Sequence, residues 1–432
     1  MKGLTALMLT LAASQALAHG LNLPPRERLA RINKEFPYSE ALVKDQLARL
    51  LPDLKEGEFE RLKAQGLLES MQLEGQSRYF VRAVDNLFYI APQYRQRRQP
   101  YSAKYGTLAP LYQPHPHLAR LMAGQSDPKR FEITHRIKVD ADVVPAGESL
   151  KFWIPYPRLI PGQQDSIELL EASPGATVGE EGDLQRSLYV TAQAQAGKAT
   201  EVFVRYRYRH LGRYQKVDPA KVTATPADPA LAPYLAPRVP HVQFTPELTA
   251  LSQRLLAGET NPYRQAQRLF AAVAAIPWAG ARDYSTIANI SQYAASAGHA
   301  DCGQKTLLLI TLLRLAGIPA RWQSGWEFSD ASFDTMHDWG QLYLAPYGWL
   351  PFDATHGLLG EEGDPQHGFY LGGLDSYRLV FNDDYSQPLV PARQWPRSDT
   401  VDAQRGEVEW RGGNLYYDQW QYQLDWQEIK TP

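Results

Sequence analysis

The sequence predicts an α+β protein in which helical and strand-rich segments are separate. Charged, helix-capping patterns dominate residues 19–128, short alternating strands follow one another over 129–215, and helices return from 245 onward. Runs of strands and runs of helices that do not alternate regularly are typical of α+β proteins. At 432 residues the chain is long enough for several domains, each with its own core.

The first 18 residues are predicted to be a cleavable signal peptide. Lys2 supplies the charged start, Leu4 to Ala13 is a short apolar run, and Ala16-Leu17-Ala18 is a small-residue cleavage site, with the cut after Ala18. No later segment has the roughly 18 uninterrupted apolar residues of a membrane helix. We therefore expect a periplasmic or secreted protein without an integral membrane segment.

Residues 19–128 are expected to form a helical N-terminal region. Ser39 is placed to cap a helix over SEALVKDQLARLL, and a second helix follows in EFERLKAQGLLES. Asp127-Pro128 marks the end of this region. The formal charge of the whole chain is −2, so nothing indicates a nucleic-acid partner.

Residues 129–215 are expected to form a small β-sandwich. From Phe131 to Val139 apolar and polar side chains alternate, which is the pattern of a half-buried strand. Several short strands within so few residues favour a sandwich. The further predicted strands are Leu150 to Ile154, Ile167 to Leu170, Leu188 to Thr191 and Val202 to Tyr208.

A proline-rich linker at 216–244 is predicted to precede a core domain at 245–385. The core begins with Thr245-Pro246-Glu247, in which a capping threonine, a first-turn proline and an acid near the helix dipole start a helix. Residues 386–432 are expected to form an aromatic hairpin packed on the core, turning at Gly412-Gly413-Asn414. Its aromatic residues suit strand packing, with a platform for a sugar or peptide as the alternative.

Cys302 is the only cysteine of the chain and is predicted to open an apolar helix that ends at Gly317, with Pro319 beyond it. A lone cysteine is commonly an inert buried residue. Here the helix start favours a nucleophile, because free backbone N–H groups stabilise a thiolate and lower its pKa. A thiol nucleophile also needs a base and a group that orients the base, and His337 and Asp353 follow in that order.

These residues resemble the transglutaminase-like superfamily, which are cysteine enzymes of papain-like fold. The resemblance rests on Cys302 opening a helix, the GIPAR turn, His337 opening an aromatic strand, and Asp353 in GWLPFDAT. It covers about Thr245 to Gly357. It implies a papain-like transglutaminase core in which Cys302 is the nucleophile, His337 the base and Asp353 the orienting group. It also implies that a β-domain before the core is common in this family.

The pairing of the two strands that carry His337 and Asp353 is left open. A turn centred between Pro346 and Tyr347 would set His337 opposite His356, whereas a centre at Ala345 would set it opposite Asp353. An asymmetric loop or a bulge would reconcile the two positions.

The expected chemistry is acyl transfer on a peptide or protein substrate, cell-wall peptides included. The thiolate would attack a carbonyl carbon, and the backbone N–H of Cys302 would donate to the oxyanion, with Trp278 or Tyr284 as candidates for a second donor. Water as the acceptor gives a peptidase or amidase, which we favour. An amine acceptor gives a cross-linking transglutaminase, and a non-catalytic binding protein on the same fold is the remaining alternative.

A zinc site is the main rival interpretation of the cysteine. His299 and Cys302, with His337 and either Asp353 or His356, could supply nitrogen, sulfur and oxygen ligands. The chain lacks the additional cysteines or H-E-x-x-H pattern typical of zinc proteins, so we predict no metal and no cofactor. It also lacks a G-x-S-x-G elbow and a phosphate-binding glycine loop.

Overall fold

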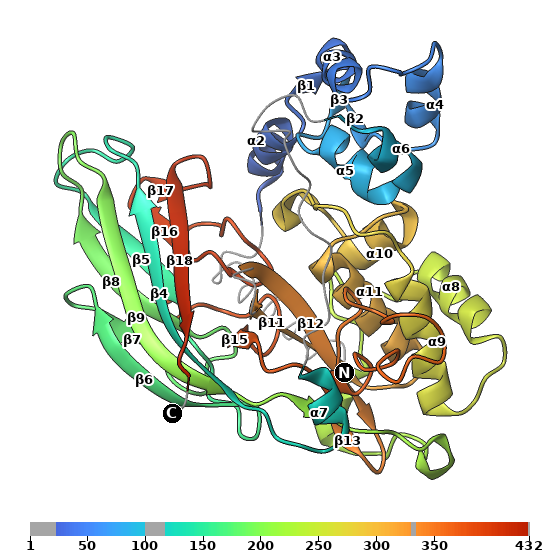
Figure 1. Cartoon of the computed structure of the whole chain (residues 1–432). Helices are drawn as coiled ribbons and strands as arrows, with labels where there is room; N and C mark the ends of the chain where they lie inside the picture. The colour runs from blue at the N-terminus through green and yellow to red at the C-terminus, as the bar shows by residue number, and fades with distance from the viewer. Residues whose placement is uncertain (1–22, 100–116, 330–333, 431–432) are drawn as a thin grey trace, which may run out of the picture.

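The computed structural model describes residues 23–99, 117–329 and 334–430, so the expected signal peptide lies outside the described residues. The described chain forms an N-terminal unit, a β-sandwich and a core of helices and sheet (Figure 1). Helices and strands are segregated, which confirms the α+β class. Within the described residues no helix has the length and apolar character needed to cross a membrane.

The N-terminal unit combines helices with a small antiparallel sheet. Ser39 caps α3 (Glu40–Leu50) by accepting a hydrogen bond from the backbone N–H of Leu42, as the sequence indicated. The sheet, in the order β1-β3-β2, was not expected. Its hairpin turns at Glu74 and Gly75, which both have positive φ, as a tight two-residue turn requires. The remaining elements are α2 (Pro25–Glu35), β1 (Tyr38–Ser39), α4 (Glu58–Ala64), β2 (Ser70–Leu73), β3 (Gln76–Tyr79), α5 (Ala83–Ile90) and α6 (Pro92–Arg97).

Two antiparallel sheets form the sandwich, in the orders β17-β16-β5-β8-β7 and β18-β4-β9-β6. In the long strands β4 and β9 every second residue is buried, because one face of the sheet packs on the sandwich core. The strands from this region are β4 (Lys129–Val139), β5 (Ser149–Pro155), β6 (Gln164–Ala172), β7 (Thr177–Val178), β8 (Ser187–Gln193) and β9 (Thr200–His210).

The C-terminal segment differs from the hairpin that was expected to pack on the core. Strand β16 (Glu407–Trp410) turns through β17 (Gly413–Asn414) but pairs mainly with β5, whereas β18 (Trp420–Glu428) pairs with β4 in the opposite sheet. Both strands extend the sandwich, because β16 pairs with the otherwise open edge of β5 and β18 pairs with the otherwise open edge of β4. Residues 383–406 lead from the core to these strands.

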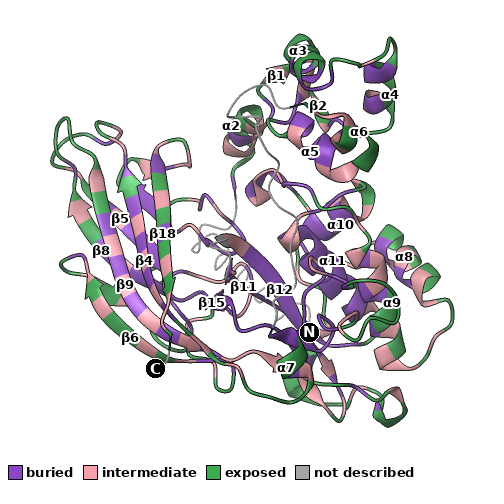
Figure 2. Ribbon diagram, in the orientation of Figure 1, coloured by how far each residue is buried: buried purple, intermediate pink, exposed green. Residues whose placement is uncertain are grey.

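The core is a four-stranded sheet, in the order β13-β12-β11-β15, with helices packed on it (Figure 1). Its central helix is α11 (Cys302–Leu315), which is buried from Gly303 to Arg314 (Figure 2). Leucines of α11 pack with Trp322, Leu342 and Leu344 of the sheet in one hydrophobic cluster. The other core elements are α8 (Pro246–Leu256), α9 (Pro262–Ala274), η4 (Tyr284–Thr286), α10 (Ile290–Ser296), β11 (Ala320–Phe328), β12 (Asp334–Leu344), β13 (Gly348–Phe352) and β15 (Arg378–Asn382).

The pairing of β12 with β13 resolves the register that the sequence left open. The ladder runs from Gly340↔Phe352 to Leu344↔Gly348 without a shift. Asp353 therefore lies one residue beyond the end of β13, on the same face of the sheet as His337 but diagonal to it. No bulge is needed within this ladder.

The segment between sandwich and core follows the core surface in short 3-10 helices rather than as an open linker. The elements outside the units described above are α7 (Leu118–Met122), β10 (Arg213–Tyr214), η2 (Pro219–Lys221), η3 (Pro229–Tyr234) and β14 (Gly373–Leu374).

Candidate active site

Cys302 is the first residue of α11, as the sequence predicted. Asp301 caps the helix by accepting a hydrogen bond from the N–H of Gln304 at 3.0 Å, and the Gln304 side chain accepts one from the N–H of Asp301 at 3.2 Å. This reciprocal capping box fixes the first turn of the helix. It holds the thiol at the edge of the core, where Cys302 is partly exposed.

The partner of the thiol is Asp338 of β12. Sγ of Cys302 donates to Oδ2 of Asp338 at 3.2 Å, and Gln404 donates to Oδ1 of the same carboxyl at 2.7 Å. Burial raises the pKa of the Cys302 thiol well above its usual value, and the negative charges of Asp338 and Asp301 raise it further. The expectation of a lowered pKa is wrong for this state, because burial and two carboxyls outweigh the helix terminus.

We predict that free Cys302 reacts slowly with iodoacetamide at neutral pH. A thiol with a raised pKa is protonated there, and the thiolate is the reactive form. The alkylation rate should rise only at a pH above the usual pKa of a cysteine, and Asp338→Asn should move that rise to lower pH, because one negative neighbour is removed. Fast alkylation of the unmodified protein below pH 7 would contradict this description of the site.

His337 and Asp353 form a buried pair on the sheet. Nε2 of His337 lies 2.7 Å from Oδ2 of Asp353, and both side chains are almost completely enclosed. Burial alone would lower the pKa of His337, but Asp353 and Glu327 raise it above its usual value. Burial likewise works to raise the pKa of Asp353, but His337, His356 and Arg378 hold it well below its usual range. The pair therefore favours an imidazolium beside a carboxylate.

Further charged groups surround this pair. Nη1 of Arg378 lies 2.9 Å from Oδ2 of Asp353, and Nη2 of the same side chain lies 2.7 Å from Asp375. His356 lies 2.6 Å from Oε1 of Glu327. The guanidinium of Arg378 thus lies beside the buried carboxylates of Asp353, Asp375 and Glu327, and a cation beside them is the condition under which buried charges are tolerated.

The ligands named in the rival zinc interpretation do not come together around Cys302. In the described part of the chain the only group that could hold a metal is Glu327, His337 and His356, whose ligand atoms lie within 4.8 Å of one another. Arg378 stands 3.4 Å from Glu327 and already supplies a positive charge there. These residues therefore fit a network of ion pairs better than a metal ion.

The predicted triad residues are divided between two hydrogen-bonded sets. His337 is bonded to Asp353, whereas the thiol of Cys302 is bonded to Asp338, the next residue along β12. Successive side chains of a strand point to opposite faces, so Asp338 faces α11 and His337 faces Glu327 and Asp353. The hydrogen bond of Cys302 to β12 is therefore made through Asp338, the neighbour of His337 in the chain.

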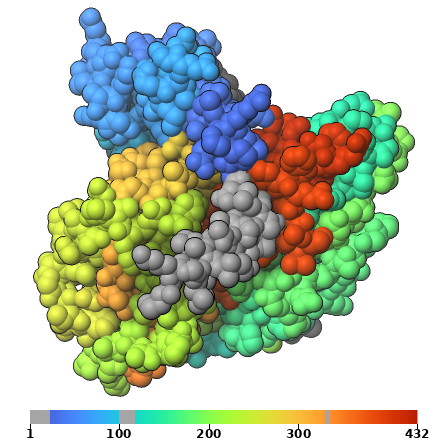
Figure 3. Space-filling view, turned by 180° about the vertical axis from the view of Figure 1, so that it is seen from behind, coloured from blue at the N-terminus to red at the C-terminus, as the bar shows by residue number. Residues whose placement is uncertain are grey.

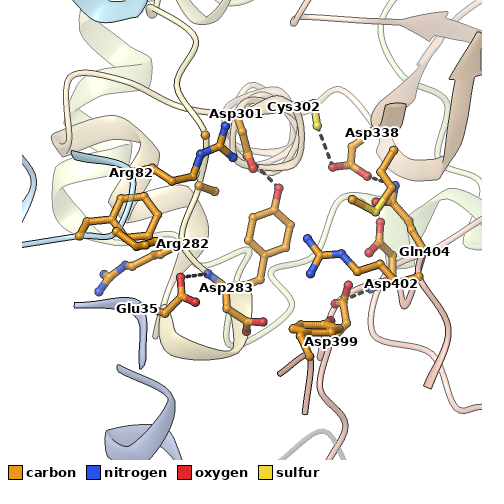
Figure 4. Close-up of a pocket in the computed structure, with 18 of the residues that line it drawn as sticks. Glu35, Arg82, Arg282, Asp283, Asp301, Cys302, Asp338, Asp399, Asp402 and Gln404 are labelled. Atoms are coloured by element: carbon orange, nitrogen blue, oxygen red, sulfur yellow. Dashed lines mark hydrogen bonds between the residues drawn. The ribbon is translucent and has the colours of Figure 1, made fainter. Parts of the chain in front are cut away.

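Both candidate oxyanion donors line the same cavity as Cys302, which has a volume of about 340 Å³ (Figure 4). The hydroxyl of Tyr284 donates to Asp301 at 2.8 Å. A Cβ at Gly303 would lie 2.2 Å from that hydroxyl, so only glycine lets the tyrosine approach the helix start. Trp278 is 37% exposed, and its ring packs edge-on against Tyr89.

The cavity is also lined by residues that the sequence did not indicate, and most of them lie far from Cys302 along the chain. Gln404, Asp402 and Arg405 of the C-terminal segment line the cavity, as do Arg82 and Glu35 of the N-terminal unit. Seen from behind, the N-terminal unit lies against both the core and the C-terminal segment (Figure 3). Asp338 could have been suspected from its place beside His337, whereas the others carry no local signal.

The core matches a known family model, and the chain is more distantly similar to solved structures. Residues 249–354 match the family model described as transglutaminase-like superfamily. Among solved structures the chain is similar to a "putative cysteine protease" from Cytophaga hutchinsonii, at 14% identity over 71% of this chain and 92% of that one, with a TM-score of 0.46. It is also similar to the periplasmic domain of TgpA from Pseudomonas aeruginosa, at 17% identity over 52% of this chain and 88% of that one, with a TM-score of 0.28. Comparison with curated proteins finds no match. Residues 249–354, which include Cys302, His337 and Asp353, are therefore identified by this match as a transglutaminase-like domain.

Proposed function

We propose that the protein is a periplasmic or secreted cysteine hydrolase that cleaves a peptide or side-chain amide through a thioester. The observation that carries the proposal is the position of Cys302 at the first turn of α11, where it opens into the cavity. The pair of His337 and Asp353 on the adjoining strands supports it, because a buried carboxylate beside an imidazole is the usual arrangement of a general base.

In the proposed reaction Cys302 attacks the amide carbonyl carbon and His337 takes the thiol proton. The negative oxygen of the tetrahedral intermediate is stabilised by the backbone N–H of Cys302. The second donor is Trp278, or Tyr284 once its hydroxyl has released Asp301. His337 then gives its proton to the departing amine as the carbon–nitrogen bond breaks, which leaves a thioester. Water attacks the thioester with His337 as base, the acid product leaves, and the proton returns to the thiol.

The role proposed for His337 requires the thiol to leave Asp338. In the substrate-free state the thiol is protonated and donates to that carboxyl. Because Asp338 and His337 face opposite sides of β12, activation needs three changes: the release of this hydrogen bond, a movement that brings the thiol and the imidazole together, and the transfer of the proton to His337. Asp353 would keep the imidazole oriented and stabilise its charged form.

We expect hydrolysis to dominate over amine transfer. The protein would be incubated with cell-wall peptides and with casein, each with and without a fluorescent amine, and the products identified by mass spectrometry. Release of peptide fragments or of ammonia without incorporation of the amine is the expected result. Stoichiometric incorporation of the amine would instead favour a transglutaminase, and an unchanged mixture would favour a binding protein.

A further inference from the structure

The cavity at Cys302 is closed by parts of the chain outside the transglutaminase-like domain. Glu35 and Arg82 come from the N-terminal unit, and Asp399, Asp402 and Arg405 come from the C-terminal segment. These walls are held in place, since Asn86 exchanges two hydrogen bonds of 2.9 Å with the backbone of Gly280. About half of the cavity lining therefore comes from residues that the family match does not cover.

Carboxyl groups predominate in this cavity, and they face it from several sides (Figure 4). The carboxyl groups that line it are those of Glu35, Asp283, Asp301, Asp338, Asp399 and Asp402. Among the described residues none of these six carboxyls has a cationic nitrogen within the 4.0 Å of an ion pair. Buried carboxyls elsewhere do have such partners: Glu407 lies 2.7 Å from Arg393, and Asp375 lies 2.7 Å from Arg378.

Three guanidinium groups also line the cavity, those of Arg82, Arg282 and Arg405. None forms an ion pair with these six carboxyls, but they offset part of their charge, since Arg282 and Arg405 act on Glu35 and Arg82 acts on Asp301. Arg405 stacks over the ring of Tyr417 at 4.5 Å. Arg282 lies over the ring of Tyr293 at 5.0 Å, with its Nε 3.7 Å from Glu69. An excess of carboxyl groups over fixed cations therefore remains beside the thiol.

Asp402 is the carboxyl of this cavity that has an unsatisfied hydrogen-bond acceptor. It is 3% exposed, and its Oδ2 has no hydrogen-bond partner among the described residues. A buried polar oxygen without a partner is costly, and such atoms normally meet a protein group, a water molecule or a ligand. Burial raises the pKa of Asp402 well above its usual value, and the neighbouring carboxyls of Asp338 and Asp399 raise it further. A cation placed among these three carboxyls would offset their mutual repulsion and favour the ionised form of Asp402.

The spacing of the carboxyls favours an organic cation over a metal ion as the ligand of this cavity. A metal needs three or more ligand atoms close together, but no three of these six groups offer oxygens within 4.8 Å of one another. Separate acceptors around a cavity suit an ammonium group, which has three donors on a flexible stem.

We propose that this cavity binds an ammonium group of the substrate, carried next to the amide that Cys302 attacks, with Asp402 as its principal acceptor. The inference rests on the proposed function, since Cys302 is taken as the group that meets the substrate. The favoured substrate is then a peptide in which an amino side chain or a free amino end lies close to the scissile amide.

Binding can be measured without turnover in the Cys302→Ala protein. The probes are the blocked peptide acetyl-alanyl-lysyl-alaninamide and its norleucyl and glutamyl analogues, titrated by calorimetry at pH 8. We expect the lysyl peptide to bind at least about tenfold more tightly than the norleucyl one, as an ion pair in a buried site allows. Equal affinities, or preference for the glutamyl peptide, would overturn the inference. So would loss of lysyl binding upon addition of one equivalent of Zn²⁺ or Ca²⁺.

Variants on two walls of the cavity test whether Asp402 and Glu35 bind the ammonium group. Asp402→Asn and Glu35→Gln, each made in the Cys302→Ala protein, should each remove most of the preference for lysine. Asp425→Asn, which neutralises a surface carboxyl of β18, should leave the preference unchanged. Unchanged lysine preference in both cavity variants would overturn the assignment. If these peptides bind as expected but the wild-type protein cleaves no amide, the proposed function fails while the ammonium site stands.

Discussion

Replacement of Cys302 by alanine is expected to abolish turnover and leave the fold intact. The thiol is the group proposed to form the thioester, and no other cysteine exists in the chain to replace it. The rate should fall to the level of a reaction without enzyme. Turnover of the substrate found in the product screen is the measurement, with circular dichroism and thermal unfolding as the tests of the fold.

The structural cost of this substitution should be small. The thiol lies at the helix start, and Asp338 keeps its hydrogen bond from Gln404 when the sulfur is removed. We expect the free energy of unfolding to change by about 1 kcal/mol or less. Cys302→Ser is the matched control, because it keeps a donor for Asp338 and supplies a much weaker nucleophile. Residual turnover in the alanine protein, or a large drop in melting temperature, would contradict the catalytic assignment.

Local signals were sufficient to predict the start of the central helix. Thr245 and Ser39 each cap a helix in the structure, and α11 begins at Cys302, because caps depend on residues within one turn of each other. The pairing of β16 and β18 with the sandwich could not be predicted in this way. It joins residues more than 250 positions apart, and the alternating pattern of a strand does not say which edge it will join.

The direction of the pKa shift of the Cys302 thiol could likewise not be predicted from local signals. The helix start was read correctly from the sequence, but the pKa shift expected from it has the wrong sign. The helix terminus is a local feature, whereas the burial and the carboxyl of Asp338 arise from chain folding. Gln404, which holds that carboxyl, comes from 66 residues farther along.

The second large effect is expected for Asp353→Asn, which should reduce both activity and stability. The amide keeps a hydrogen bond to His337 but loses the charge that favours the imidazolium. We expect turnover to fall by about ten to a thousandfold, the range for perturbing one acid–base partner. The substitution also removes a carboxylate from Arg378, which keeps Asp375 and Glu327 as partners. We therefore expect the free energy of unfolding to fall by about 3 kcal/mol, the low end for a broken buried ion pair.

The dependence of this loss on pH follows from the directions of the two pKa shifts. The lowered pKa of Asp353 means that its carboxylate stabilises the fold above the unfolded pKa of an aspartate, and that this contribution is lost as pH falls through the folded pKa. The raised pKa of His337 means that its contribution is complete below the unfolded histidine pKa and is lost as pH rises through the folded pKa. The stability gap between wild type and Asp353→Asn should thus be widest at about pH 5 to 6 and narrower at both extremes.

Asp375→Asn is the control that separates orientation of the base from support of Arg378. Asp375 accepts from Nε and Nη2 of Arg378 at 2.9 and 2.7 Å, whereas the carboxylate hydrogen-bonded to His337 is that of Asp353. It should therefore cost a comparable amount of unfolding free energy, about 3 kcal/mol, with a much smaller effect on turnover measured well below the melting temperature. Denaturant unfolding and steady-state rates of both variants give the comparison. If both variants lose stability and activity in the same proportion, Asp353 acts through Arg378 and the fold. If Asp353→Asn alone loses turnover, its carboxylate acts on His337, because only that variant changes the charge next to the imidazole.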